Sequence, residues 1–415
     1  MREMKESGIS WIGEIPFSWN VMPNKYLMKK KKVICPVYNG EDILSLTMKG
    51  VIVRDLDAGG KMPTSFDGYQ RLEPGNLLMC LFDIDVTPRC IGLIKQAGLS
   101  SPAYSQFVLN DIASAEYYCY YYTMLDNDKT LLHLAKNLRH SLTEDQLGAI
   151  STIVPPVQEQ KRIADFLNAK CAKIDSLTDD IQTQIDTLEK YKRSVITEAV
   201  TKGLNPDVEM KDSGLKWIGK IPSSWNVMPN KYLMKKKKVI CPVYNGENIL
   251  SLTMKGVIVR DLDAGGKMPT SFDGYQRLEP GNLLMCLFDI DVTPRCIGLI
   301  KQAGLSSPAY SQFELNGMGS AEYYCYYYTM LDNDKTLLHL AKNLRHSLTE
   351  DQLGAISVIV PPVQEQKIIA DFLDAKCEEI DKVIAAKIEQ LAIIDEYKKS
   401  LIYEYVTGKK EVPAI

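Results

Sequence analysis

The chain contains nearly the same sequence twice. WIGEIPFSWNVMPNKYLMKKKKVICPVYNGE begins at Trp11 and WIGKIPSSWNVMPNKYLMKKKKVICPVYNGE begins at Trp217, a constant offset of 206 residues. Between Trp11 and Pro155, only eight positions differ from their counterparts between Trp217 and Pro361. Such a period is far longer than the roughly 20 to 50 residues of a solenoid repeat. The sequence therefore predicts two whole domains of one fold, each followed by its own segment, and predicts that both copies bind the same thing.

Composition limits the class of protein. Of the 415 residues, 45% are hydrophobic and 24% are charged, which is ordinary for a globular protein of two or three domains. No apolar run approaches the roughly 18 to 20 residues needed to span a bilayer. The opening residues MREMKESG also lack the apolar core of a secretory signal. The sequence therefore predicts a cytoplasmic protein with no membrane segment.

Cysteine spacing and charge bear on cofactors and partners. The ten cysteines include no CxxC pair, so reduced thiols in the core are favoured over a metal or redox site, and no metal is expected. The net charge of −3 argues weakly against a stand-alone nucleic-acid binder. Lysines nevertheless crowd one stretch of each copy, at Lys25, Lys29, Lys30, Lys31 and Lys32, and at Lys231, Lys235, Lys236, Lys237 and Lys238.

The first 150 or so residues of each copy mix strand and helix patterns. The runs VICPVY, GVIVRD, NLLMCLFDIDV and RCIGLIK are rich in β-forming residues and are separated by turn formers. EYYCYYYTML is a further aromatic run, which favours a strand. KTLLHLAKNLRHSL has helical spacing, with Leu131, Leu134, Leu138 and Leu142 on one face. Together these patterns predict an α+β domain.

A long helical segment follows each copy, after Pro155-Pro156 and after Pro361-Pro362. Proline ends the preceding strand and suits the first turn of a helix. Residues then recur in steps of three and four for about five heptads, the period of a coiled-coil seam. The predicted seams are Leu167, Cys171, Ile174, Thr178, Ile181, Ile185, Leu188, Lys192, Val195 and Ala199, and Leu373, Cys377, Ile380, Ile384, Lys387, Leu391, Ile394, Lys398, Leu401 and Tyr405. A rod of roughly 40 residues, about 60 Å long, would leave this stripe exposed unless the two helices packed together.

Several spaced motifs, each present twice, resemble the specificity subunit of Type I restriction–modification systems. WIGEIPFSW and WIGKIPSSW open the domains, and IVPPVQEQKRIADFLNAK and IVPPVQEQKIIADFLDAK begin the helices. YKRSVITEAVTKGL and YKKSLIYEYVTGKK end the helices. The resemblance covers essentially the whole chain in the order domain, helix, domain, helix.

The resemblance implies a fold and a domain plan. The fold is α+β, with two globular α/β target-recognition domains separated by two long helices that form an antiparallel coiled coil with pseudo-two-fold symmetry. The first recognition domain is expected over 1–155 and its helix over 156–203. The second recognition domain is expected over 204–361, its helix over 362–408 and a tail over 409–415.

The resemblance also implies a division of labour. Each recognition domain reads one half of a split double-stranded DNA sequence through the major groove, and the helices set the unspecified spacer. Two modification subunits dock on the helices and methylate adenine with S-adenosylmethionine. Restriction (motor-nuclease) subunits use ATP and Mg to cleave unmethylated DNA. This chain is then not an enzyme and binds none of these cofactors itself.

The near identity of the two domains departs from the usual family pattern, in which the recognition domains are unlike. Two like domains related by the dyad of an antiparallel helix pair should read an inverted repeat. The sequence therefore predicts a bipartite target with identical half-sites in inverted orientation.

Candidate DNA contacts are basic, hydroxyl and tyrosine side chains in polar, turn-rich stretches, which can bind phosphates or base edges. In the first copy they are Lys29, Lys30, Lys31, Lys49, Arg54, Lys61, Ser65, Tyr69, Arg89, Ser101 and Tyr104. In the second copy they are Lys235, Lys236, Lys237, Lys255, Arg260, Lys267, Ser271, Tyr275, Arg295, Ser307 and Tyr310. The lysine runs have an equal alternative as solvated strand or loop edges.

Two further sets of positions complete the prediction. The start of each helix is the candidate docking site for partner subunits, through Gln158, Glu159, Gln160, Gln364, Glu365 and Gln366. The copies differ most at one stretch, where Val108, Asp111, Ile112 and Ala113 become Glu314, Gly317, Met318 and Gly319. We expect that loop to face solvent or to contact something different in each half.

Catalytic interpretations are weaker than structural ones. Asp83 and Asp85 could imitate a nuclease metal pair, but alternation along a strand explains both. His133 and His140 have no partner in metal-ligand spacing. A GxxxxGK[ST] phosphate loop and an adenine-methyltransferase signature are both missing from the sequence. The tyrosines at 117–122 favour an aromatic strand core over base stacking. Two rival functions remain, a scaffold that displays two protein-binding domains and a free-standing DNA-binding repressor.

Overall fold

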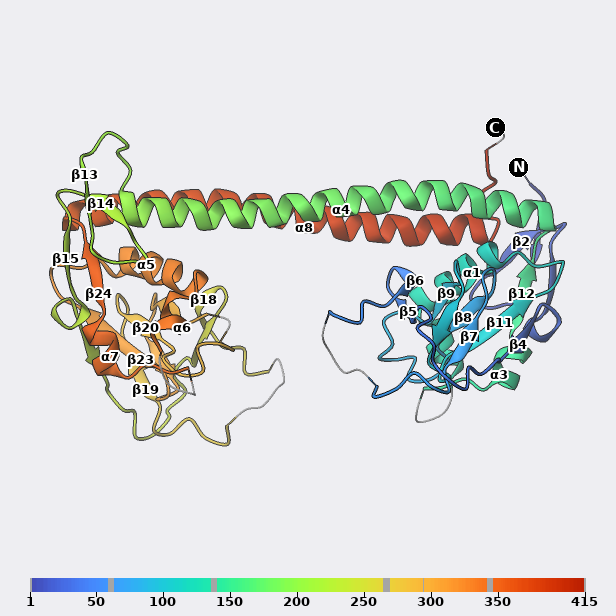
Figure 1. Cartoon of the computed structure of the whole chain (residues 1–415), viewed down its shortest axis with the longest axis horizontal. Helices are drawn as coiled ribbons and strands as arrows, with labels where there is room; N and C mark the ends of the chain where they lie inside the picture. The colour runs from blue at the N-terminus through green and yellow to red at the C-terminus, as the bar shows by residue number, and fades with distance from the viewer. Residues whose placement is uncertain are drawn as a thin grey trace. The chain divides into compact units, whose positions relative to one another are not determined.

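The computed structural model describes residues 2–58, 63–135, 140–263, 269–293, 295–341 and 346–413. These residues form two compact units. Unit 1 comprises Met1–Ile181 with Ile388–Ile415, and unit 2 comprises Gln182–Lys387. Each unit therefore holds one domain copy, the first part of the helix that follows this copy, and the last part of the other helix (Figure 1).

The strands are short. Those of the first copy are β1 (Met4–Glu6), β2 (Glu14–Pro16), β3 (Asn20–Pro23), β4 (Met28–Lys31), β5 (Leu44–Thr47), β6 (Gly50–Val53), β7 (Gln70–Leu72), β8 (Leu77–Met79), β9 (Ile91–Leu93), β10 (Gly98–Ser100), β11 (Ser105–Leu109) and β12 (Ser151–Val154). Those of the second copy are β13 (Met210–Asp212), β14 (Lys220–Pro222), β15 (Asn226–Pro229), β16 (Met234–Lys237), β17 (Leu250–Thr253), β18 (Gly256–Val259), β19 (Gln276–Leu278), β20 (Leu283–Met285), β21 (Ile297–Leu299), β22 (Gly304–Ser306), β23 (Ser311–Leu315) and β24 (Ser357–Val360).

Helices fall into a short and a long class. The short ones are the 3-10 turns η1 (Asn24–Tyr26) and η2 (Asn230–Tyr232), and the helices α1 (Ala115–Asn127), α2 (Thr130–Leu134), α3 (Glu144–Ala149), α5 (Ala321–Asn333), α6 (Thr336–Leu340) and α7 (Glu350–Ala355). The long ones are α4 (Val157–Lys202) and α8 (Val363–Val406). The mixed content confirms the predicted α+β fold with two long helices.

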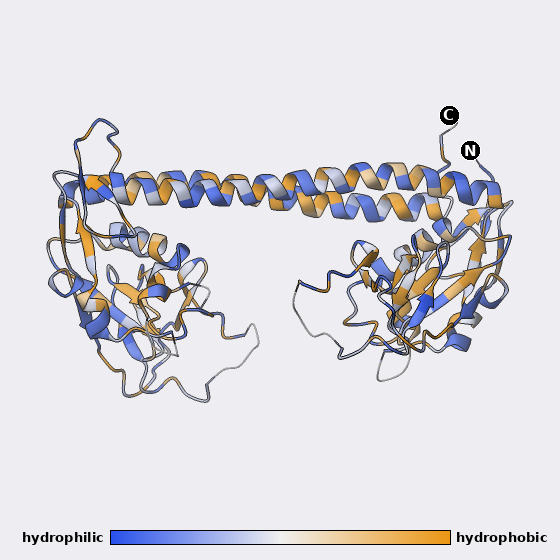
Figure 2. Cartoon of the chain, viewed as in Figure 1, coloured by the Kyte–Doolittle hydropathy of each residue, from blue (hydrophilic) through white to orange (hydrophobic). Residues whose placement is uncertain are grey.

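A four-stranded antiparallel sheet forms the centre of each domain, in the order β4-β11-β8-β9 and its repeat β16-β23-β20-β21. Phe107 of β11 lies opposite Leu77 of β8 and opposite Lys30 of β4. Because Leu77 and Phe107 are buried while Lys30 is exposed, the sheet packs its middle strands and leaves β4 as a charged edge. Figure 2 shows these central strands as mainly hydrophobic segments.

The aromatic run that we predicted as a strand is helix α1, so that prediction was wrong. Ser114 caps the helix by accepting a hydrogen bond from the Tyr117 amide, as N-cap serines do. Tyr117, Tyr118, Tyr121 and Tyr122 are all at most 1% exposed. Their spacing follows the helical period, and burial of this stripe outweighs the modest strand preference of tyrosine. The prediction that these rings belong to the core is confirmed.

Two other local predictions need correction. The helix expected across KTLLHLAKNLRHSL ends at Leu134 in α2, and Leu138 lies outside the described residues. The strand expected across NLLMCLFDIDV ends at Met79, and Asp83 adopts a left-handed φ of 47°. FDID is therefore a turn rather than a strand with both aspartates on one face. All ten cysteines are free and at least partly buried, as predicted.

Helices α4 and α8 follow the predicted seams. Every seam position is buried or half-buried in both helices. Figure 2 shows hydrophobic and hydrophilic residues alternating along both. Each helix begins directly after its proline pair, at Val157 and at Val363. Among the described residues, no helix combines the length and hydropathy needed to cross a membrane.

Within each unit the two helix segments are antiparallel. In unit 1 the Lys398 ammonium lies 2.5 Å from the Asp175 carboxylate, and the Phe166 and Tyr405 rings are 4.5 Å apart. In unit 2 Lys192 lies 2.6 Å from Asp381. The two ion pairs occupy equivalent positions of the repeat, because Asp175 corresponds to Asp381 and Lys192 to Lys398.

The end of each long helix packs on the domain copy that this helix does not directly follow: α8 ends on the first copy and α4 on the second. Tyr117 of α1 donates a 2.7 Å hydrogen bond to the Val406 carbonyl at the end of α8. The equivalent Tyr323 donates a 2.8 Å hydrogen bond to the Val200 carbonyl in α4. Gly408 follows α8 with a φ of 71°, and a Cβ built there would lie 2.6 Å from the ring of Pro16. This turn therefore requires glycine for both conformation and space.

We expect Gly408→Ala to destabilise unit 1 by roughly 2 to 4 kcal/mol, because the left-handed conformation and the overlap with Pro16 add their costs. Gly75→Ala is the matched control, since Gly75 has a φ of 85° and open space at the Cβ position. It should cost only about 1 to 2 kcal/mol. The midpoint of the urea transition followed by tryptophan fluorescence measures both, and equal shifts would contradict the steric account of the seat.

Candidate nucleic-acid interface

A small lobe projects from each central sheet and has its own apolar clusters. In unit 1 we define it as residues 33–58, 63–72 and 94–104. One cluster contains Leu44, Leu72, Leu78 and Ile94, and another contains Cys35, Ile43 and Leu99. Bridges join Ile34 to Gln70 and Ile43 to Leu99. The small lobe of unit 2, residues 239–263, 269–278 and 300–310, repeats both clusters.

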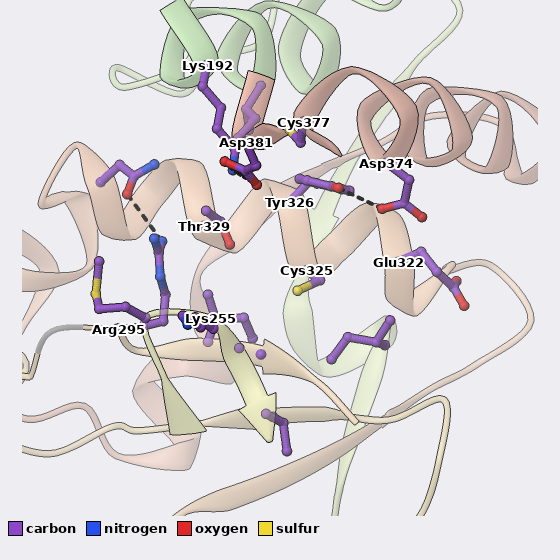
Figure 3. Close-up of a pocket in the computed structure, with 18 of the residues that line it drawn as sticks. Lys192, Lys255, Arg295, Glu322, Cys325, Tyr326, Thr329, Asp374, Cys377 and Asp381 are labelled. Carbon is purple, nitrogen blue, oxygen red and sulfur yellow. Dashed lines mark hydrogen bonds and ion pairs between the residues drawn. The ribbon is translucent and has the colours of Figure 1, made fainter. Parts of the chain in front are cut away.

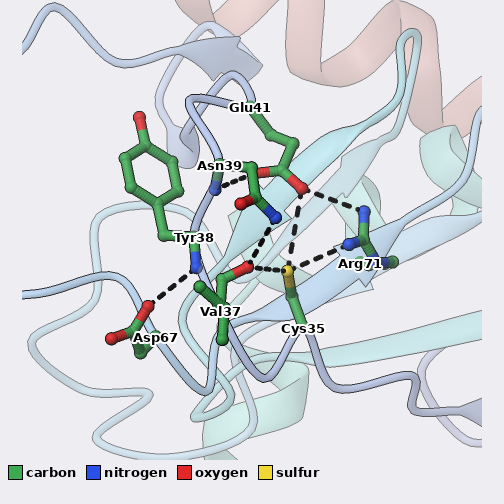
Figure 4. A network of polar contacts seen from close by, with 7 residues as sticks. All are labelled: Cys35, Val37, Tyr38, Asn39, Glu41, Asp67 and Arg71. Carbon is green, nitrogen blue, oxygen red and sulfur yellow. Dashed lines mark hydrogen bonds and ion pairs between the residues drawn. The ribbon is translucent and has the colours of Figure 1, made fainter.

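A polar network fixes the loop at 36–42 of this lobe (Figure 4). The buried Cys35 thiol accepts a 3.1 Å hydrogen bond from the Arg71 guanidinium, which also lies 3.2 Å from the Glu41 carboxylate. Glu41 in turn accepts a 2.8 Å hydrogen bond from the Asn39 amide. The Tyr38 amide donates a 2.7 Å hydrogen bond to Asp67. The loop is therefore held in one conformation before any ligand arrives.

The same network is present in unit 2 with the same distances. Arg277 donates to the Cys241 thiol at 3.1 Å and lies 3.2 Å from Glu247. The Asn245 amide donates a 2.8 Å hydrogen bond to Glu247. The two lobes thus present equivalent surfaces.

Aromatic packing and one amide group join the remaining segments of the lobe. Phe66 makes edge-to-face contacts with Tyr38 and Tyr69 at centroid distances of 5.1 and 5.3 Å. The buried Gln70 side chain donates to the carbonyl oxygens of Ser101 and Tyr104 at 2.9 and 2.8 Å. These contacts bring segments 63–72 and 101–104 into one surface.

Most of the predicted DNA-contact residues lie on the small lobes. They are Lys49, Arg54, Ser65, Tyr69, Ser101 and Tyr104 in unit 1, and Lys255, Arg260, Ser271, Tyr275, Ser307 and Tyr310 in unit 2. Lys61 and Lys267 lie outside the described residues. The geometry therefore groups residues that the sequence left scattered over more than 50 positions.

The lysine runs lie elsewhere, on the edge strands β4 and β16, and several are paired with carboxylates. Lys31 lies 2.5 Å from Glu73 and Lys30 lies 3.6 Å from Glu144. In unit 2, Lys237 lies 2.6 Å from Glu279 and Lys236 pairs with Glu350. The neighbouring carboxylates offset the positive charge of these lysines, so their attraction for a phosphate is weaker than the sequence indicated. Lys29 and Lys235 are exposed on the same strands.

The two edges differ at Glu314, which replaces Val108. The Glu314 carboxylate lies 3.7 Å from Lys237. The hydrogen bond that Lys237 donates to Glu279, followed by the charges of both carboxylates, raises the pKa of this lysine. Val108 and Ile112 are exposed in unit 1. Of the two alternatives predicted for this stretch, exposure to solvent therefore applies to these two positions.

Arg89 and Arg295 have an internal role that argues against base reading. The Arg89 side chain is 15% exposed, with its guanidinium 3.2 Å from Asp126 and 2.8 Å from the Asn127 side-chain oxygen. Asp126 is buried and also accepts from the Cys90 amide. Arg295 repeats this arrangement. The ion pair ties the end of α1, or of α5, to the central sheet.

A cleft of about 720 Å³ lies within unit 2 between α4, α8, α5 and the β17–β18 hairpin (Figure 3). Much of its charge is already neutralised, because Lys192 pairs with Asp381 and the Tyr326 hydroxyl donates a 2.6 Å hydrogen bond to Asp374. Lys255 of the hairpin and Cys325 of α5 also line the cleft. The cleft combines paired charges with an apolar wall.

The start of each helix contacts its own domain as well as solvent. Gln160 is fully buried and bonds the Ser114 amide and the carbonyls of Ile112 and Pro155. Such burial is incompatible with direct docking of a second protein on Gln160, and on its repeat Gln366, which makes the same bonds. Gln158 and Gln364 are exposed, so their docking role stays a prediction.

Glu159 forms a clasp that sequence reasoning missed. It accepts a 2.9 Å hydrogen bond from the fully buried Trp19 indole and bonds both terminal nitrogens of Arg2, at 2.5 and 2.8 Å. Burial raises the pKa of Glu159, but the bonds from Arg2 and Trp19 and the Arg2 charge outweigh it, so the pKa lies below its ordinary value. Glu365 keeps the bond to Trp225 at 2.9 Å. The second tryptophan of each opening segment, at the end of WIGEIPFSW and WIGKIPSSW, was the available signal.

The aspartates and histidines considered for catalysis are surface or turn residues. Asp85 lies 3.1 Å from His140, and this hydrogen bond lowers the pKa of Asp85. His133 is exposed and its ring contacts the Lys129 carbonyl. Within the described ranges, no three His, Cys, Asp or Glu side chains are arranged to hold a metal ion.

The network around Glu41 generates a pH prediction. The Asn39 amide, ahead of the Arg71 charge, lowers the pKa of Glu41 from the ordinary value of 4.5. A lowered pKa means that the contact is complete above 4.5 and is lost as the pH falls through the folded-state value. We expect the Asn39 amide signal in NMR spectra to shift in that acidic range.

Glu41→Gln should abolish this titration of the Asn39 signal, whereas the matched variant Glu247→Gln should leave it unchanged and abolish that of Asn245. A titration of Asn39 that persists in the Glu41→Gln protein would show that another group fixes the loop.

Comparisons with known proteins agree with this architecture. Residues 312–390 match the family described as Type I restriction modification DNA specificity domain. The chain is 26% identical over 289 residues to a protein named putative type I restriction enzyme MjaX specificity subunit from Methanocaldococcus jannaschii, covering 66% of this chain and 62% of that protein. It is 25% identical over 275 residues to the type I restriction enzyme MjaVIII specificity subunit of the same organism, covering 62% of each. The matches thus span less than two thirds of the length of these relatives.

The fold is also similar to that of a solved chain, described under "Structural basis underlying complex assembly and conformational transition of the type I R-M system". The TM-score is 0.68 at 14% sequence identity, over 95% of this chain and 99% of that one. This likeness concerns the fold alone. By its family match over residues 312–390 and by these two named relatives, the chain is similar to type I restriction–modification specificity subunits.

Proposed function

We propose that this chain is the DNA-recognition subunit of a type I restriction–modification complex and that each small lobe reads one half of a bipartite target. The observation that carries the proposal is the duplication itself, which preserves a preorganised loop, its Cys35 network and the surrounding polar side chains in both copies. A rigid polar loop is suited to base edges, since little conformational entropy is lost on binding.

The two half-sites should be identical in sequence and inverted in orientation. Support comes from the equivalent lobes and from the antiparallel packing of α4 and α8 inside each unit, with the same Lys–Asp pair in both. A two-fold rotation that superimposes one copy on the other also exchanges α4 with α8. Because these helices are antiparallel, the same rotation would reverse the direction in which the second domain reads the DNA. On this proposal α4 and α8 set the unspecified spacer.

The partners follow from the same proposal. Two modification subunits would dock on the helices, and restriction subunits would join them on double-stranded DNA. S-adenosylmethionine, ATP and Mg would then act on those partners. The helices offer exposed apolar side chains for such contacts, including Leu177 and Tyr191 of α4 and Ile368 of α8, which are 48, 49 and 51% exposed. Gln158 and Gln364 would lie beside the docked subunits.

Methylome sequencing of cells that express this chain with its modification subunit tests the target. We expect methylated adenines in two identical inverted half-sites separated by a fixed spacer. Two unrelated half-sites would refute the inverted repeat. Specific binding by the chain alone would favour a repressor, and no effect of the chain on DNA binding or methylation would favour a scaffold.

The salt dependence of binding distinguishes the two groups of lysines. Among the described residues no carboxylate pairs with Lys49 or Lys255, and both are exposed. Replacing both with alanine should reduce the slope of log K against log salt concentration by about 0.9 per lost phosphate contact.

The charge-neutral double variant Lys31→Ala with Glu73→Ala is the matched control and should leave that slope unchanged, because it removes an existing ion pair. If only the control reduced the slope, we would conclude that the phosphates contact the β4 edge and not the small lobe.

A further inference from the structure

An apolar pocket opens in unit 2 between the β17–β18 hairpin and the turn that follows β20, and unit 1 has the same residues at the equivalent positions. In unit 2 it has a volume of about 390 Å³ and is lined by Leu252, Thr253, Met254, Cys286, Phe288, Val292, Thr293, Arg295 and Tyr310. Its equivalents in unit 1 are Leu46, Thr47, Met48, Cys80, Phe82, Val86, Thr87, Arg89 and Tyr104, the same residue types throughout.

The polar groups that line this pocket already have hydrogen-bond or ion-pair partners within the chain. The Thr47 hydroxyl donates to the Gly50 carbonyl at 3.0 Å, and the Thr87 hydroxyl donates to the Asp83 carbonyl at 2.8 Å. Arg89 is held by Asp126. Cys80 lies 3.2 Å from the Phe82 carbonyl, and burial is the main reason why the pKa of its thiol is raised. The threonines and cysteine thus contribute mainly apolar surface.

A stacked aromatic pair forms one wall. The Phe82 and Tyr104 rings have centroids 6.1 Å apart and an interplanar angle of 29°. Phe288 and Tyr310 repeat the pair at 6.0 Å and 22°. Burial raises the pKa of Tyr104, opposed in part by the charge of Arg54.

Large apolar side chains at the mouth are left in water. Val86 is 73% exposed and Met48 is 61% exposed, and Val292 and Met254 repeat these values at 73 and 60%. An exposed apolar rim around a concave site is typical of a surface that a ligand covers. Lys49 follows Met48 on the same turn and Arg54 lies nearby, so the ligand that fits is apolar at its tip and anionic around it.

We propose that each pocket receives the C5-methyl group of a pyrimidine in the major groove, so that each half-site contains a thymine read by apolar contact. This inference rests on the proposed DNA-recognition function. The methyl group is the one apolar group that a base pair presents in that groove, and threonine methyls and aromatic rings are known contacts for it. The phosphates that flank the groove supply the negative charge that Lys49 and Arg54 would face.

Uracil substitution tests the inference, because uracil differs from thymine only in lacking this methyl group. With the specificity and modification subunits assembled on a duplex that contains the methylated target, each thymine is replaced in turn. We expect one position per half-site at which affinity falls about four-fold, as for one buried methyl group, and about fifteen-fold when both half-sites are changed. If no thymine is sensitive but 5-methylation of one cytosine per half-site raises affinity, the pocket takes the methyl group of 5-methylcytosine and the thymine assignment is wrong.

Variants that shorten the valines at the mouth test whether the pocket is responsible for the thymine-to-uracil discrimination. Val86→Ala combined with Val292→Ala should erase most of the thymine-to-uracil discrimination at that position and at no other. Val33→Ala combined with Val239→Ala is the matched control, since these valines are 39 and 41% exposed on the same lobes but belong neither to the pocket nor to the loop at 36–42 and its repeat. It should leave the discrimination unchanged.

The outcomes separate the two levels of the proposal. Specific binding without a uracil-sensitive or methyl-sensitive position overturns the pocket inference and leaves DNA recognition standing. Discrimination that survives the Val86 and Val292 changes, or is lost equally in the control, also overturns it. Loss of all specific binding by the unmodified complex would instead refute the proposed function.

Discussion

The seat of each helix end on a domain is the interaction on which the rest of the structure depends. Leu401, Ile402, Tyr405 and Val406 of α8 belong to the same buried cluster as Leu77, Phe107 and the tyrosines of α1. Ile196, Ala199 and Val200 of α4 complete the equivalent cluster in unit 2. Neither core is therefore closed by its own domain copy alone, and each depends on the end of the long helix that follows the other copy. The consequence for folding is asymmetric. Unit 2 is continuous in sequence, whereas unit 1 needs residues 388–415, so its closure by the Tyr117–Val406 bond joins positions 289 apart and carries the larger entropic cost.

The sequence was sufficient for features that depend on long, regular patterns. A 3.5-residue period held for five heptads cannot be satisfied by a strand, and α4 and α8 begin and end within two residues of the predicted bounds. Local patterns were less decisive. In α1 the tyrosines prefer strands intrinsically, yet burying four rings on one helix face gains more. The FDID segment alternates like a strand, but the left-handed Asp83 and the contact of Asp85 with His140 make it a turn. Contacts with residues more than 50 positions away, such as His140 for Asp85 and Val406 for Tyr117, override the local preference for a strand. A short stretch of sequence does not contain these partners.

The candidate site shows the same limit in another form. Residue type and polarity directed attention to Lys49, Tyr69 and Tyr104, which all lie on the small lobe. They could not separate these from Arg89, whose charge is used by the buried Asp126, or from Gln160, whose amide closes the junction of domain and helix. A basic or amide side chain has the same appearance in sequence whether its partner is a phosphate or a carboxylate of the same chain. Identity between the copies added little, since nearly every residue of the domain is repeated.

The way in which the helices have diverged follows from how they are held. The phenol of Tyr117 bonds the backbone carbonyl of Val406, and that of Tyr323 bonds the backbone carbonyl of Val200, acceptors that almost any side chain would leave in place. The helix surface could therefore change, as at Tyr405, which packs on Phe166, against Ala199 at the equivalent position of unit 2. The domains contain no comparable freedom at the Cys35 network or the Phe82–Tyr104 wall, where side chains contact side chains. On the proposed function, a spacer needs only its length and its seam, whereas a reading surface needs its individual atoms, and this difference would explain why the two domains are nearly identical while the two helices are not.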